Sequence, residues 1–228
     1  MPLSPELAAR RKADRATLLA RRMAAPAADH ARWSGAIEAH LREALGAIAG
    51  WTVGFCWPFQ AEFDARPFVR DLRRRGSRAA LPVVVGKGEP LEFHEWWPGV
   101  AMLNGVYDVP VPDGTARLEP DLLLIPAVGI GSAGDRLGYG GGFFDRTLAA
   151  CTPRPVSIAL AFELSRLPTT EPQSHDVLMD LVVTESGWEV AEGGRLERVD
   201  AAGAAARVAA IAAARGIPQR SSALPKVS

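Results

Sequence analysis

Gly134–Arg146, with the sequence GDRLGYGGGFFDR, is the stretch around which the predicted fold is arranged. Four glycines fall within positions 138–142, and Arg136 and Arg146 lie on either side of them. Glycine adopts positive φ angles and lets the backbone approach a ligand closely. Amide N–H groups at the start of a helix point toward an anion, and arginines add charge-assisted hydrogen bonds. The stretch therefore predicts a phosphate site; a glycine-rich turn that only joins two core elements is the simpler alternative.

The segments around this stretch predict a strand, the loop and then a helix. Asp121–Pro126 is a short apolar run typical of a buried strand, and Phe143–Ala150 has the character of the first turns of a helix. Further strands are predicted over 51–59, 79–85, 91–96, 156–162, 181–184 and 195–199, and further helices over 4–23, 33–48, 68–75 and 201–215. Residues 98–120 are rich in Pro and Gly and predict an irregular excursion. Strands that alternate with helices predict an α/β fold with three layers, α/β/α, around a mostly parallel central sheet.

The composition narrows the class of protein. The chain is 48% hydrophobic, which predicts a sizeable core. Its formal net charge is +0, so the protein as a whole has no electrostatic field that would attract nucleic acid or a membrane surface. The two cysteines, Cys56 and Cys151, are too few for a disulfide scaffold, and no apolar run resembles a signal peptide or a membrane span. We expect a cytoplasmic protein without a nucleic-acid or membrane partner. Binding of nucleic acid by the basic first helix and the Arg70–Arg78 cluster is a weaker alternative.

Several chemistries are excluded by spacing. The glycine loop lacks the order of a P-loop, and Gly131–Gly134 is not a nucleophile elbow because Ile130 occupies the place of its first glycine. The histidines have no mutual spacing for zinc. They are His30, His40, His94 and His175.

Two carboxylates are candidate ligands for Mg²⁺. Asp145 directly follows the glycines, and Asp180 precedes the strand over 181–184. Hard oxygen ligands near a phosphate loop suggest a magnesium ion held between protein and nucleotide. For Asp180, a cap or turn before the strand is an equally good interpretation. For the aromatic residues near the predicted site, core packing competes with contact to a flat ligand; they are Trp96, Trp97, Phe143 and Phe144.

The glycine motif resembles the signature of the 5-formyltetrahydrofolate cyclo-ligase family, also named 5,10-methenyltetrahydrofolate synthetase. That family usually has Gly-x-Arg-Leu-Gly-x-Gly-x-Gly-Tyr-Tyr-Asp-Arg at this place. Over residues 8–186, four further segments fall into register with family motifs in the same order. They are Arg11 with Arg15, Glu62–Pro67, Leu91–Trp96 and His175–Asp180.

The resemblance implies an ATP- and Mg²⁺-dependent ring closure that converts 5-formyltetrahydrofolate to 5,10-methenyltetrahydrofolate with release of ADP and phosphate. Arg136 and Arg146 would be catalytic, and Asp145 and Asp180 would hold Mg²⁺. The ATP site would comprise Arg11, Arg15, Arg136, Leu137, Gly138, Tyr139, Gly140, Gly141, Gly142, Phe143 and Phe144. The reduced folate would contact Trp57, Glu62, Trp96, Phe143 and Phe144. Residues 1–200 would form a single cyclo-ligase-like domain, and 201–228 an alanine-rich helix and loose tail; the protein would be a monomer or weak homodimer.

The chain differs from the family pattern on the folate side. Gly131 stands where an aspartate is common, and Val111 precedes Pro112 where a glutamate is usual. Phe143 and Phe144 replace two tyrosines. These differences leave two alternatives: a diverged paralogue that binds ATP and a folate-like or other formyl or carboxylate ligand, and a binder without turnover.

Overall fold

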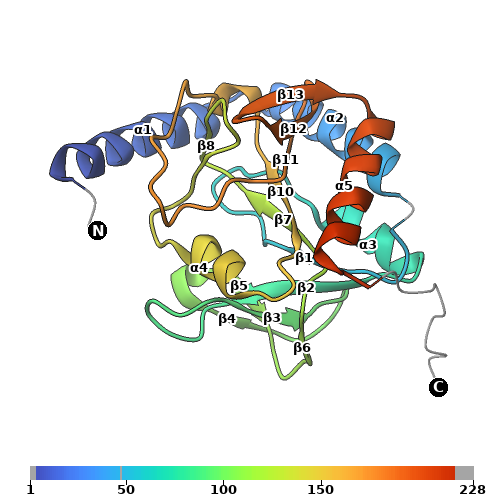
Figure 1. The fold of residues 1–228 in the computed structure, drawn as a ribbon. Coiled ribbons are helices and arrows are strands. Elements are labelled where there is room, and N and C mark those ends of the chain that lie inside the picture. Colours follow the sequence, from blue (N-terminus) through green and yellow to red (C-terminus); the bar gives the residue numbers. More distant parts are fainter. Residues whose placement is uncertain (1–3, 47, 219–228) are drawn as a thin grey trace, which may run out of the picture.

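The computed structural model describes residues 4–46 and 48–218, which fold around a nine-stranded sheet (Figure 1). Its strand order is β13-β12-β11-β10-β7-β1-β2-β3-β6. Strands β11, β10, β7, β1 and β2 are parallel to one another, and antiparallel strands extend the sheet at both edges. The parallel strands are β1 (Thr52–Phe55), β2 (Arg78–Val83), β7 (Leu122–Pro126), β10 (Val156–Leu160) and β11 (Leu181–Thr184); the antiparallel ones are β3 (Glu92–Glu95), β6 (Arg117–Leu118), β12 (Gly187–Glu192) and β13 (Arg195–Val199).

Alternate residues of the central strands face opposite layers, which confirms the three-layer prediction. Leu122 and Leu124 of β7 join one core cluster, while Leu123 and Ile125 join the other. The first cluster lies against helices α2 (Ala27–Leu45), α3 (Arg66–Arg74) and α5 (Ala201–Arg215). The second lies against α4 (Phe143–Ala150), which Figure 1 shows on the other side of the sheet.

Helix α1 (Pro5–Met23) lies at the carboxyl edge of the sheet. Ser4 caps it by accepting a hydrogen bond from the Leu7 amide, as its Ser-Pro-Glu start predicts. Leu18 packs against Val128 and Leu137, which follow the end of β7. The helix therefore brings its arginines to the edge where ligands bind in open α/β sheets.

The excursion over 98–120 holds short elements that its composition hides. They are β4 (Met102–Asn104), the 3₁₀ helix η1 (Val106–Asp108), β5 (Pro110–Pro112) and β6. Strand β12 was not predicted at all. It pairs with β11 and β13, and its alternating burial places Trp188 and Val190 in the core.

Helix α5 has the predicted bounds. Ala204, Val208 and Ala212 are buried in the same cluster as Leu41 and Val183, so the helix packs on the core of the sheet. Of the predicted tail, residues 219–228 lie outside the described residues. Among the helices of the described part, none combines the length and apolarity that crossing a membrane requires.

Candidate active site

The glycine loop lies between a short hairpin and α4. Strand β8 (Gly129–Ile130) pairs with β9 (Arg136–Leu137), and α4 begins at Phe143. Gly140 and Gly142 have φ angles of 96° and 63°, which glycine adopts without strain. Gly142 is the N-cap and provides no side-chain hydrogen bond to the first amides of α4. The loop therefore offers helix-start amides to an anion.

Arginine side chains occupy the space that the glycines leave. Arg15 Nε donates to the Gly138 carbonyl at 2.7 Å, and Arg146 Nη2 donates to the Gly141 carbonyl at 2.7 Å. An added Cβ at Gly140 would lie 3.4 Å from the Arg15 guanidinium carbon, and one at Gly142 would lie 2.8 Å from Arg146 Nη1. The glycines thus admit guanidinium groups as well as a ligand, and positive charge surrounds the loop.

Arg136 is held by a carboxylate of α4. Its Nη2 lies 3.1 Å from Asp145 Oδ2, and its guanidinium lies 5.7 Å from the Phe144 ring centre. Burial lowers the pKa of Arg136, while Asp145 and then Asp176 oppose that shift. Asp145 Oδ1 also accepts a hydrogen bond from the Val177 amide at 3.2 Å. These contacts fix both side chains between the loop and residues 170–180.

We name residues 170–180 the strap, because Arg11 ties this segment to the first helix. Arg11 donates to the Thr170 and Glu171 carbonyls and lies 2.6 Å from Asp176 Oδ2. Burial alone would raise the pKa of Asp176, but the hydrogen bond from Arg11 lowers it overall. Arg11 and Arg15 therefore lie on the same side as the loop: one holds the strap and the other lines the glycines.

A polar network that contains the buried side chains of Arg22 and Glu62 lies on the other side of the loop. Tyr139 donates to Glu62 Oε1 at 2.6 Å and accepts from Arg22 Nη2 at 2.7 Å, and Glu62 also accepts from the Phe59 amide. Burial raises the pKa of Glu62 and of Tyr139. Arg22 was not predicted, since it is one of several arginines on α1. The sequence around Arg22 does not separate it from the other arginines of the helix. Only its burial in the structure distinguishes it from them.

Cys56 directly follows β1. Burial raises the pKa of its thiol, Glu62 raises it further, and Arg136 opposes the shift. The contact that joins the predicted folate residue to the glycine loop is the hydrogen bond that Tyr139 donates to Glu62.

The predicted aromatic residues differ in their positions. Trp57 is half-buried with Arg66 4.3 Å from its ring centre. Trp96 is buried in the main core, edge-on to Phe55 at 5.1 Å, which accounts for it as a packing residue. Phe143 and Phe144 pack beneath the loop beside Arg146 and Arg136.

Asp180 does not join Asp145. It precedes β11 at the amino end of that strand and accepts hydrogen bonds from Arg215 and from the Ser157 amide and hydroxyl. This is the strand-start role that the sequence left open, and it does not fit a metal ligand. Asp176 is the strap carboxylate that acts on Arg136 together with Asp145. Among the described residues, no group of three or more His, Cys, Asp or Glu side chains could hold a metal ion.

The space of the missing side chain at Gly131 is filled by another carboxylate. A Cβ there would lie 2.1 Å from Asp135 Oδ2. Asp135 is buried and accepts from the Thr170 amide at 2.5 Å and from the Ala133 amide at 3.2 Å. The glycine and the aspartate therefore form one unit that joins the loop to the strap.

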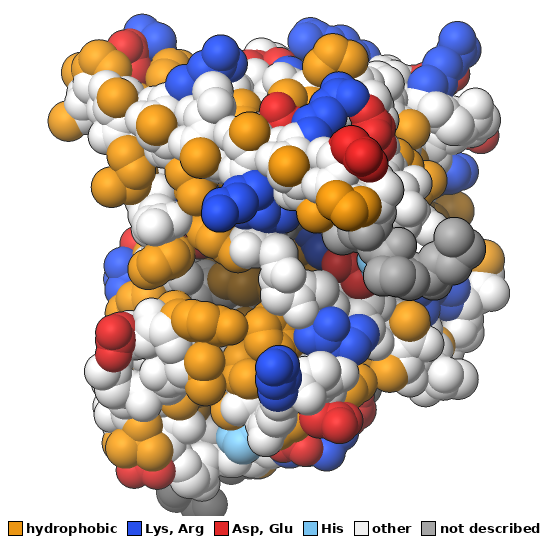
Figure 2. Space-filling model, turned by 90° about the vertical axis from the view of Figure 1, so that its left-hand side faces the viewer, with side chains coloured by type: hydrophobic (Ala, Val, Ile, Leu, Met, Phe, Trp, Pro, Cys, Tyr) orange, Lys and Arg blue, Asp and Glu red, His pale blue; other side chains and the backbone are white. Residues whose placement is uncertain are grey.

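Figure 2 shows the side of the molecule on which α1 and α4 lie. A hollow separates its upper and lower parts, with hydrophobic side chains inside and Lys and Arg side chains around the rim. An α/β fold with a basic glycine loop at its carboxyl edge and a hollow with a basic rim on the same side of the molecule defines a candidate phosphate-using enzyme.

The chain belongs to the 5-formyltetrahydrofolate cyclo-ligase family, whose sequence profile matches residues 8–185. It is 35% identical to the 5-formyltetrahydrofolate cyclo-ligase of Mycolicibacterium smegmatis over 147 residues, which cover 60% of this chain and 75% of that protein. It is 33% identical to the Escherichia coli enzyme of the same name over 153 residues, 62% of this chain and 82% of that protein.

Solved structures agree on the fold. The 5,10-methenyltetrahydrofolate synthetase of Aquifex aeolicus superposes with a TM-score of 0.70 and 20% identity, covering 83% of this chain and 96% of that one. The Mycoplasma pneumoniae protein of that name gives a TM-score of 0.64 and 24% identity, covering 77% and 98%.

Proposed function

We propose that this protein is an ATP-dependent cyclo-ligase that converts 5-formyltetrahydrofolate to 5,10-methenyltetrahydrofolate. The formyl oxygen attacks the γ-phosphorus of ATP and ADP leaves; N10 then attacks the activated carbon, and the C–O bond to phosphate breaks. Family membership supports the reaction class. The observation that carries the proposal is that Arg15, Arg136 and Arg146 surround the glycine loop while Tyr139 of the same loop donates a hydrogen bond to Glu62.

The phosphate end of the proposed site rests on fixed positive charge. Preorganised donors stabilise charge that develops on a transferring phosphoryl group at no cost in reorganisation. Arg136 is held by Asp145, and Arg146 is held by the Gly141 carbonyl. Arg15 keeps both terminal nitrogens without a hydrogen-bond partner among residues 4–46 and 48–218, after its Nε bonds to Gly138. Arg15 therefore keeps donors for nucleotide phosphates.

The folate end rests on Glu62. A buried carboxylate accepts hydrogen bonds from the N–H groups of a pterin ring, and Tyr139 and Arg22 hold it in place. Phe143 and Phe144 offer apolar surface beside Arg146 and Arg136. Trp57, in the segment between β1 and Glu62, is a further candidate for contact with the folate.

We propose that magnesium binds beside the glycine loop. Mg²⁺ is usually held by one or two carboxylates together with substrate phosphates and water. Asp145, in the first turn of α4, would hold it together with the nucleotide phosphates, and the ion would neutralise charge on the nucleotide. Asp180 is not retained in this role because it lies at the amino end of β11, bound to Arg215 and Ser157.

We propose a cytoplasmic protein, acting on small molecules as a monomer or weak homodimer. Both cysteines are free, which suits a reducing compartment. The basic cluster on and after α3 is engaged internally, since Arg73 and Arg78 both bind Glu95. That supports the absence of a nucleic-acid partner.

The test is an absorbance assay for the methenyl product with purified protein, MgATP and 5-formyltetrahydrofolate. ATP-dependent product formation is expected; its absence at high enzyme concentration would exclude this activity. Calorimetry in the same buffer identifies the second candidate, a binder without turnover, if ATP and folate bind and no product forms. One observation favours the binder without turnover. Gly131 has no side chain, and the Asp135 carboxylate fills the space that a side chain at position 131 would take.

A further inference from the structure

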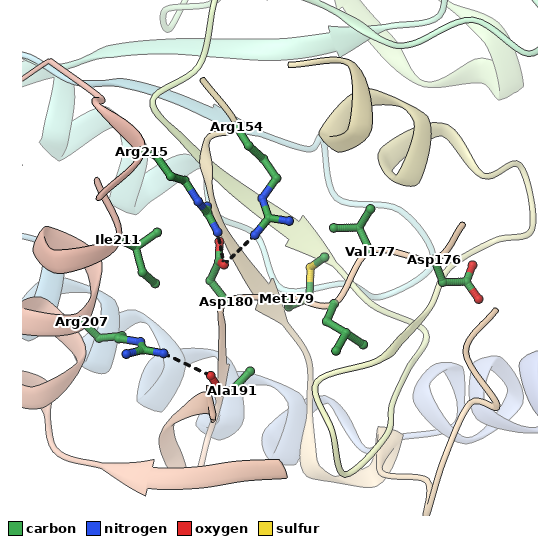
Figure 3. Close-up of a pocket in the computed structure, with 10 residues that line it drawn as sticks. Arg154, Asp176, Val177, Met179, Asp180, Ala191, Arg207, Ile211 and Arg215 are labelled. Carbon is green, nitrogen blue, oxygen red and sulfur yellow. Dashed lines mark hydrogen bonds and ion pairs between the residues drawn. The ribbon is translucent and has the colours of Figure 1, made fainter. Parts of the chain in front are cut away.

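A second basic pocket lies apart from the glycine loop, between α5, β12 and the strap (Figure 3). Its volume is about 530 Å³. Its charged wall is formed by Arg154, Arg207 and Arg215 together with Asp180, and its apolar wall includes Met179 and Ile211. Helix α5 lies beyond residues 8–185 of the family match. The pocket is therefore built in part by an element outside that match.

Helical spacing places two of these arginines on one face of α5. Arg207, Ile211 and Arg215 are four residues apart in sequence, so they lie above one another on successive turns. Figure 3 shows Arg215 pointing toward Asp180, Ile211 beside them, and Arg207 pointing toward the Ala191 carbonyl. Arg154, from the segment after α4, closes the same space from the opposite side.

The charges of this pocket do not balance within the described residues. Arg215 pairs with Asp180 through both terminal nitrogens, and Arg154 is a weaker partner of the same carboxylate at 3.2 Å. Asp176 is compensated by Arg11 and points away from the arginines in Figure 3. Two neutral pairs therefore leave the charges of Arg154 and Arg207 in excess.

Arg207 also lacks partners. Its Nη2 lies 3.4 Å from the Ala191 carbonyl, a long hydrogen bond, and its buried Nε has no partner among the described residues. A buried donor without a partner is costly, and an arginine fork binds phosphate oxygens well. We infer that this pocket binds a small phosphate monoester, with the dianion between Arg154 and Arg207 and the organic part against Met179 and Ile211.

The test is calorimetric titration of the full-length protein with phenyl phosphate and with inorganic phosphate, at pH 7.5 in a buffer free of phosphate and sulfate. Arg207→Gln is expected to weaken one phenyl phosphate binding step by at least about tenfold. Arg195→Gln is the matched control, because Arg195 lies on β13 outside the pocket and its side chain is 75% exposed. The affinity of this variant for phenyl phosphate should stay within about twofold of that of the unchanged protein. Circular dichroism confirms that the variants fold, and Arg154→Gln should reproduce the loss.

Arg146→Gln separates this pocket from the proposed active site, because Arg146 contacts the Gly141 carbonyl and the Phe143 ring and does not line the pocket. It should leave the Arg207-dependent step unchanged, whether or not the protein has cyclo-ligase activity. The inference is overturned if no step depends on Arg207 and Arg154, or if Arg146→Gln removes the step that depends on them. Equal affinity for inorganic phosphate and phenyl phosphate would overturn the assignment of a monoester, since the apolar wall would then contribute nothing.

Discussion

Arg22 and Glu62 approach to 3.8 Å with side chains only 4% exposed, and the Tyr139 hydroxyl bonds to both. A buried ion pair gains little unless its remaining donors and acceptors are satisfied. Here Arg22 also donates to the Gln60 and Ala127 carbonyls, and Glu62 accepts from the Phe59 amide. The pair therefore fixes α1, the loop after β1 and the glycine loop to one another.

Tyr139→Phe should lower the free energy of unfolding by about 1–2 kcal/mol, because it removes the hydroxyl between two buried charges. Urea denaturation measures this loss. Tyr107→Phe is the control: Tyr107 is 68% exposed, and its change should stay within about 0.5 kcal/mol. Equal losses in both variants would mean that the Tyr139 hydroxyl contributes no special stability.

Arg136→Ala should reduce turnover by at least about 10²-fold while the fold remains intact, because one preorganised donor to developing charge is lost. The absorbance assay measures the rate, and Arg195→Ala provides the charge-matched control. A rate within a few-fold of the original would remove Arg136 from the mechanism.

Glu62→Gln should raise the KM for the folate by about tenfold or more and leave the affinity for ATP nearly unchanged. The change keeps shape but replaces an ionised acceptor by a neutral amide. Steady-state kinetics with each substrate varied separately tests this split. A change confined to ATP would place Glu62 on the nucleotide side instead.

Gly131→Ala should destabilise the protein by about 1–3 kcal/mol, since its Cβ would collide with the Asp135 carboxylate. In an Asp135→Ala background the same change should cost almost nothing, and this double-mutant cycle identifies the collision. Gly35→Ala, on the helical position with open space around it, serves as control and should be neutral or stabilising. Equal costs of Gly131→Ala in both backgrounds would contradict the geometry.

Asp180→Asn should lower the free energy of unfolding at pH 7 by about 2 kcal/mol. It should also reduce the loss of this free energy as the pH falls. Burial would raise the pKa of Asp180, but the hydrogen bonds from Arg215 and Ser157 lower it below the usual 3.8. A carboxyl with a lowered pKa stabilises the fold above its unfolded pKa, and that stability is lost as pH falls through the folded value. Chemical denaturation between pH 7 and pH 2 tests this; parallel curves for variant and natural protein would refute it.

Sequence patterns predicted the loop and the elements around it well, because glycine spacing and apolar runs are local signals. Helices α4 and α5 and strands β11 and β13 have the bounds that their sequences indicate. Asp180 was wrongly paired with Asp145 because nearness to the glycine motif was weighed above strand direction. A residue directly before a parallel strand lies at the amino edge of the sheet, whereas the glycine loop lies at the carboxyl edge. Arg22 was missed because burial on a helix rich in arginine depends on which turn faces the loop after β1, and that is decided by tertiary packing.

The strap has a consequence for how the site forms during synthesis. Arg11 and Asp176, which form an ion pair, are separated by 165 residues. Asp180 can pair with Arg215 only after a further 35 residues have been synthesised. Contacts between distant parts of a chain form late, because loop closure must precede them. The nascent polypeptide can therefore build α1 and the first strands early, but it gains a complete phosphate site only after the strap has emerged from the ribosome.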